Sequence, residues 1–115
     1  MDYSRVTPRA RTGTTGINDE RDLTADKSII FDIPDRVAAV SIQVAIPADS
    51  TATYKIETTC NRPETIGADG SGGYWFNIYG DGAILDGSGV IMLANSVTGV
   101  RVTCLTGEIN VAICG

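Results

Sequence analysis

Large apolar residues alternate with polar ones in the carboxy-terminal part of this 115-residue chain, and this period of two constrains the fold most. The alternation runs through residues 99–105, stops at Thr106-Gly107 and resumes through residues 108–113, which predicts a β-hairpin. A type I turn with a bulge at Gly107 is the alternative, and it shifts the pairing beyond the turn. In the hairpin register one face collects Val100, Val102, Cys104, Ile109, Val111 and Ile113.

Further strands are predicted upstream, each ended by turn-forming residues. The loop 47–50 is predicted to close a second hairpin, and the unbroken apolar run at 90–95 is typical of a strand buried on both faces. About seven short strands separated by turns are the pattern of a single β-sandwich or jelly-roll-like domain. The upstream strands cover residues 28–33, 39–46, 52–58, 74–79 and 90–95. The expected core contains Val40, Ile42, Val44, Tyr54, Ile56, Phe76, Val100, Val102, Val111 and Ile113.

Composition supports this all-β prediction. The chain has 13 glycines and four prolines, and no long segment carries apolar residues at helical spacing, so we expect little or no helix. No apolar run is long enough for a membrane span, and the amino terminus lacks the apolar segment of a secretory signal. We therefore expect synthesis in a reducing cytoplasm and no membrane partner. Buried free thiols are the favoured reading of the three cysteines, Cys60, Cys104 and Cys114.

Residues 1–26 are predicted to form an extended arm outside the domain at 27–115. The arm has few large apolar residues, so it is either a disordered terminus or a segment that orders across a neighbouring subunit. Three arginines, Arg5, Arg9 and Arg11, are opposite in charge to residues 28–115, which hold nine acidic and four basic residues and so have a net charge of −5. These arginines are the predicted partner-binding residues, and the acidic body disfavours nucleic acid. Removing the arm is expected to leave the sandwich folded.

Histidine is absent from the chain, which excludes histidine-based nucleophile pairs and histidine-ligated zinc. Carboxylates at turns and on polar strand faces are typical of a solvated surface rather than an acid/base pair. The Asp-Gly loops at Asp69, Asp81 and Asp86 are first of all turns, with a bound cation as the less favoured alternative. We therefore expect no catalytic residues, no metal and no cofactor.

Two aromatic residues are candidates for a ligand or interface site. Trp75 and Tyr79 fall on one face of the predicted strand 74–79. Such a pair can stack on a sugar ring, as in carbohydrate-binding modules, but packing beneath a loop or against a partner is more common. Packing is the favoured interpretation.

The stretch Val-Thr-Gly-Val-Arg-Val-Thr at 97–103, followed by a glycine turn and Glu-Ile-Asn-Val-Ala-Ile at 108–113, resembles the ending of small virion proteins of tailed bacteriophages. With a small sandwich and an irregular arm, the chain is most similar to capsid decoration, or cement, proteins. The resemblance covers about 20 residues. It implies a non-enzymatic homotrimer that binds major capsid protein subunits in the virion. A head-tail joining or tail protein is the alternative within this class, and a carbohydrate-binding module is the alternative outside it.

Overall fold

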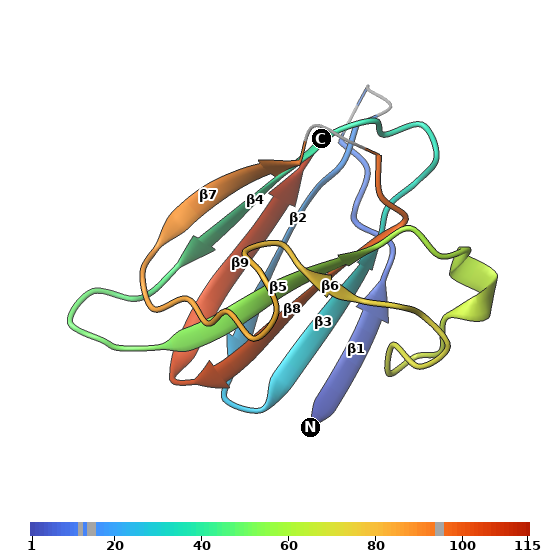
Figure 1. The fold of residues 1–115 in the computed structure, drawn as a ribbon. Coiled ribbons are helices and arrows are strands. Elements are labelled where there is room, and N and C mark those ends of the chain that lie inside the picture. The colour runs from blue at the N-terminus through green and yellow to red at the C-terminus, as the bar shows by residue number, and fades with distance from the viewer. Residues whose placement is uncertain (12, 14–15, 94–95) are drawn as a thin grey trace.

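The described residues of the computed structural model, 1–11, 13, 16–93 and 96–115, form two β-sheets packed face to face (Figure 1). A five-stranded sheet has the order β1-β3-β8-β5-β6, and a four-stranded sheet has the order β2-β9-β4-β7. The prediction of an all-β sandwich is confirmed. The elements are β1 (Asp2–Val6), β2 (Asn18–Thr24), β3 (Lys27–Asp32), β4 (Val40–Ala45), β5 (Thr53–Thr59), the 3₁₀ turn η1 (Pro63–Thr65), β6 (Phe76–Asn77), β7 (Gly89–Leu93), β8 (Gly99–Thr106) and β9 (Glu108–Cys114).

Consecutive strands in the described chain lie in opposite sheets at every connection except that between β5 and β6. Both predicted hairpins are therefore wrong. β8 lies between β3 and β5 in one sheet, whereas β9 lies between β2 and β4 in the other, and the loop 47–50 likewise joins strands of different sheets. The chain makes the last crossing at Gly107, whose φ of 76° is the left-handed conformation that glycine adopts without a steric cost. The two apolar strand faces thus meet across the interior instead of side by side.

The core lies between the two sheets. Six residues of β8 and β9, those predicted to share one hairpin face, are all fully buried within it. Every predicted core residue is buried except Phe76, which is 69% exposed, so that part of the prediction is wrong. Burying each large aliphatic side chain contributes about 1.5–3 kcal/mol, so the alternating strands supply most of the stabilising area.

The segment predicted as an arm contributes two strands to the sandwich. β1 pairs in parallel with β3, and β2 pairs along its whole length with β9. Ile17 and Leu23 are buried in the core. A boundary at residue 26 therefore does not separate an arm from the core. These two strands contribute few side chains to the core, since β1 has no buried residue and β2 only Leu23, and this explains why their polar composition resembled a loop.

Two other predicted strands differ from the structure. The segment 74–79 forms only the two-residue strand β6, and turns lie before and after it. β7 begins at Gly89 and ends at Leu93, while residues 94–95 of the predicted strand lie outside the described residues. β7 is an edge strand that exposes Val90 and Met92, so its predicted burial on both faces is wrong.

Candidate interaction surfaces

A row of four side chains crosses the outer face of the five-stranded sheet. The registers place Arg5 beside Ile30, Ile30 beside Arg101 and Arg101 beside Glu57, on β1, β3, β8 and β5 in turn. Ile30 is fully buried although it points away from the sandwich core. Another part of the chain must therefore cover this face.

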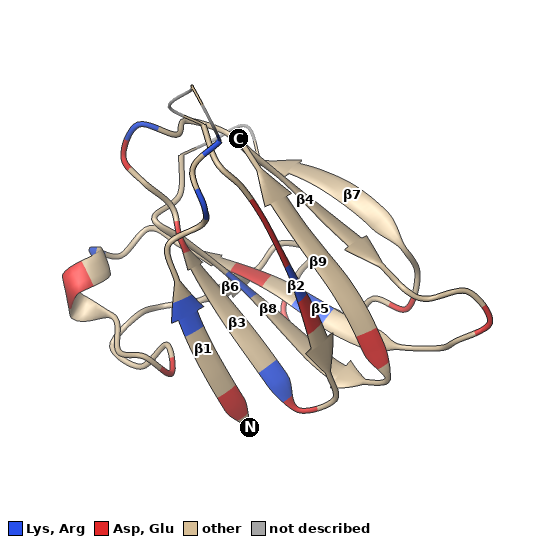
Figure 2. Cartoon of the chain, turned by 180° about the vertical axis from the view of Figure 1, so that it is seen from behind, with Lys and Arg blue, Asp and Glu red and all other residues tan. Residues whose placement is uncertain are grey.

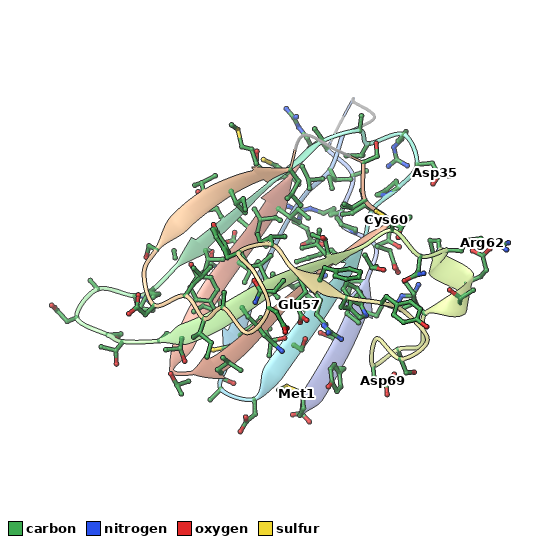
Figure 3. The ribbon with its side chains drawn as sticks, in the orientation of Figure 1. Met1, Asp35, Glu57, Cys60, Arg62 and Asp69 are labelled. Atoms are coloured by element: carbon green, nitrogen blue, oxygen red, sulfur yellow. The ribbon has the colours of Figure 1, made fainter. Side chains whose placement is uncertain are left out.

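The cover is the segment between β5 and β6, which folds back over the outer face near β1 and β3 and carries Arg62 and Asp69 (Figure 3). Trp75 anchors it, because its ring lies 4.6 Å from the Arg101 guanidinium carbon and its indole N–H donates to the Gly70 carbonyl at 2.9 Å. Arg101 Nη2 in turn pairs with the Glu57 carboxylate at 3.0 Å. A cation over an aromatic face is favourable, and more so when partly desolvated.

Arg5 fastens the same segment from the other side. Its Nε donates to the Asp32 carboxylate at 2.9 Å, Nη2 donates to the Pro63 carbonyl at 2.9 Å, and Nη1 donates to the Ile66 carbonyl. A guanidinium offers five donors in a rigid fork, and here it serves a carboxylate and two carbonyls. Arg5 therefore acts within the chain, which differs from its predicted partner-binding role.

The other predicted arginines and the aromatic pair are dispersed. Arg9 and Arg11 are exposed. Trp75 lies over β8 near Gly99, whereas Tyr79 lines a cleft beside Tyr54, toward the opposite end of β5. The structure does not bring Trp75 and Tyr79 together as a sugar-stacking platform. The predicted interpretation of packing fits Trp75, which lies beneath a loop.

The cleft beside Tyr79 opens between the two sheets and encloses about 240 Å³. Its floor includes the buried side chains of Ile42 and Ile56, and its rim includes the exposed Tyr79 and Ile84. The Tyr54 hydroxyl donates to the Gly87 carbonyl at 2.6 Å, which ties the rim loop to β5. Burial raises the pKa of the Tyr54 phenol, and the charges of Tyr79 and Asp86 act in the same direction.

Most exposed large apolar residues of the described chain lie in one stretch of the sequence, between residues 74 and 92, and the others are Met1 and Tyr3. The stretch contains Tyr74, Phe76, Tyr79, Ile84, Val90 and Met92. This stretch contains β6 and β7, each of which is the last strand of its own sheet. Charged residues mark β1 and β2, whereas β4 and β7 carry none (Figure 2). The pair β4 and β7 is thus an uncharged, partly exposed end of the four-stranded sheet, and the sequence did not reveal this because β7 resembled a buried strand.

The Asp-Gly loops and the cysteines add no site. Asp69 accepts hydrogen bonds from Ser71, which lower the pKa of its carboxyl. Among the residues that the structure describes, no cluster of His, Cys, Asp or Glu side chains is placed to hold a metal ion. All three cysteines are free thiols, but only Cys104 is buried, so predicted burial is wrong for Cys60 and Cys114. The described residues also include no helix with the length and apolarity needed to cross a membrane.

One solved structure shares this arrangement of sheets. The crystal structure of Aeromonas hydrophila PliG, a periplasmic lysozyme inhibitor of g-type lysozyme, matches with a TM-score of 0.50 and 13% sequence identity. The match covers 99% of this chain and 98% of PliG. The fold is PliG-like. Neither a protein-family model nor a curated protein matches the chain.

Proposed function

We propose that this chain is a non-catalytic protein-binding domain that attaches to other proteins of a virus particle as a capsid decoration protein. The exposed apolar residues Tyr79, Ile84 and Val90, which line one cleft, carry the proposal. Monomeric soluble proteins rarely leave large apolar patches uncovered, and such patches mark interaction sites. The bacteriophage context comes from the resemblance of the carboxy-terminal stretch.

The cleft rim is the proposed attachment point. Tyr79 and Ile84 are both more than half exposed beside an apolar cleft. Aromatic and aliphatic anchors that insert beside an apolar pocket supply most of the affinity in protein interfaces. An apolar side chain of a major capsid subunit would fill the cleft and cover both rim residues. Copies bound on a lattice also gain avidity, so each contact can be small.

Cosedimentation with particles assembled from the major capsid protein of the same genome tests the proposal. Tyr79→Ala and Ile84→Ser should each weaken binding at least about fivefold, because truncating an anchor typically costs 1 kcal/mol or more. Tyr3→Ala is the matched control, because Tyr3 is a tyrosine of similar exposure, 45% against 51%, that lies on β1 and does not line the cleft. If the full-length protein stays in the supernatant while the particles sediment, the proposal is contradicted.

A second candidate function is inhibition of a lysozyme, which the PliG-like fold favours. It is also a protein-binding function without catalysis. Adding the chain in excess to a g-type lysozyme and following lysis of cell-wall substrate separates the two candidates. Unchanged lysis together with particle binding supports capsid decoration and excludes lysozyme inhibition. Inhibition of lysis without particle binding supports lysozyme inhibition instead.

A further inference from the structure

The strands at the sheet edges of the described chain differ in how they are protected from another chain. β1 carries Asp2 and Arg5, β2 carries four charged residues among seven, and β6 is two residues long. Charge and short length are common devices by which edge strands avoid pairing with other molecules. β7, with the sequence Gly-Val-Ile-Met-Leu, has no charge and no proline. β7 is therefore the edge least protected against an added strand.

The exposure of β7 fits this conclusion. Within its sheet it pairs with β4 alone, and none of the described segments runs along its far side (Figures 1 and 2). Val90 and Met92 are 63% and 78% exposed on the outer face, while Ile91 and Leu93 are half-buried on the inner face. In an antiparallel ladder, alternate residues of an edge strand direct their N–H and C=O groups away from the sheet. An added strand would satisfy these groups and cover the apolar side chains together.

We propose that β7 pairs antiparallel with β7 of a second copy of this chain, across a two-fold axis at Ile91. The strand is self-complementary in this register. Val90 faces Met92 of the second copy and Met92 faces Val90, so two apolar pairs form on the outer face. Gly89 faces Leu93, which gives the larger side chain space at each end. The two four-stranded sheets then form one continuous sheet.

Charge favours β7 over the other edges as the contact. The chain has a net charge of −5, so two copies repel where their carboxylates approach. β7 itself carries no charged residue, whereas β2 carries Asp19, Glu20, Arg21 and Asp22. A contact at β7 therefore brings no charged strand residue into the new ladder, whereas self-pairing of β2 would bring the carboxylates of two copies together.

The pairing goes beyond the proposed function and uses a neighbouring surface. Val90 and Ile91 of β7 line the cleft together with Tyr79 and Ile84, whereas Met92 does not line it. The pairing gives a two-fold dimer, in contrast to the trimer that the resemblance implies. Loss of particle binding by Tyr79→Ala with the dimer intact, or loss of the dimer by Met92→Lys with particle binding intact, distinguishes failure of one proposal from failure of the other.

Sedimentation velocity over a wide concentration range tests the pairing. We expect a monomer–dimer equilibrium in the wild-type chain. Met92→Lys should raise the dimer Kd about tenfold or more, because it places a charge in an apolar contact. The double variant V90E/M92K should recover much of this loss, because opposite charges then face each other across the axis. Thr24→Lys is the control, since it adds the same charge at the opposite edge of the same sheet.

A chain that stays monomeric throughout overturns the proposal, as does a dimer that both Met92→Lys and Val90→Lys leave unchanged. Circular dichroism melts verify that each variant is folded. Hydrogen exchange of the wild-type protein provides a measurement without mutation. Amides of β7 should gain protection as concentration rises, whereas protection gained at β1 or β2 instead contradicts the assignment of the edge.

Discussion

Arg5 on β1 and Asp32 on β3 form an ion pair of 2.9 Å that links two strands of one sheet and also holds the covering segment at Pro63. Both side chains are mostly buried, at 20% and 26% exposed. Arg5→Ala should therefore lower the free energy of unfolding by about 1–3 kcal/mol, because three hydrogen-bond acceptors lose their donor. Urea unfolding measures the change. Arg9 is an exposed arginine, so the free energy of unfolding of Arg9→Ala should stay within about 0.5 kcal/mol of wild type. An equal effect of the two substitutions would contradict this stabilising role of Arg5.

Deleting residues 1–22 should abolish the cooperative thermal transition of the isolated protein. The deletion removes β1, most of β2 and the fully buried Ile17, whose burial alone is worth about 2–3 kcal/mol. Typical domains have only about 5–15 kcal/mol of stability in total. The structure thus reverses the expectation that this segment is dispensable. Circular dichroism decides the matter, and a truncated chain that melts like the full one would show that the two strands are not needed.

Gly107→Ala should destabilise the protein by about 3 kcal/mol or more. A Cβ at this position would collide with the Thr51 carbonyl oxygen and lie 2.9 Å from the Ala52 Cα, in addition to the cost of a positive φ. Gly82→Ala is a matched control, because Gly82 has the same φ of 76° but nothing within 4 Å of its Cβ position. It should cost about 1 kcal/mol. Chemical denaturation of both variants separates the collision from the backbone strain.

Trp75→Ala should release the segment that covers Ile30. Loss of the contact with Arg101 and of the hydrogen bond to Gly70 should cost about 2–3 kcal/mol and raise hydrogen exchange across residues 63–73. Trp75→Phe keeps a ring over Arg101 and should cost about half as much. If Trp75→Ala instead leaves exchange unchanged in this segment, the ring does not anchor it.

Stability should decline on the alkaline side because of Cys104. Burial raises the pKa of its thiol above the ordinary 9.0, with Asp26 and Glu108 acting in the same direction. The native state therefore holds the proton more tightly than the unfolded state, so the stability is fully present below pH 9.0 and is lost as the pH rises through the folded pKa. Urea unfolding in this range should show a slope that Cys104→Val reduces. Cys114→Ser, at an exposed thiol, should retain it.

The strands with clean alternation were predictable, but their partners were not. The residues from 99 to 113 form two strands as predicted, yet the same inward face arises whether the chain folds back within a sheet or crosses to the other one. A glycine of positive φ such as Gly107 suits either arrangement. β2 was missed because it contributes little apolar area beyond Leu23. The exposure of β7 was not predicted, because a buried strand and an uncovered edge strand can carry the same uninterrupted apolar run at 90–93.

The repeated crossing between sheets also sets the order in which the molecule can fold. Asn18 pairs with Cys114, and β9 separates β2 from β4, so the four-stranded sheet has a gap until its last strand is in place. Local hairpins that would nucleate folding early are nearly absent from the described chain. Because long loops must close before most pairings form, folding should take milliseconds to seconds, as is typical of topologies with distant partners. During synthesis on the ribosome, strands made early, such as β2, therefore remain without their partner until the last strand, β9, has been made.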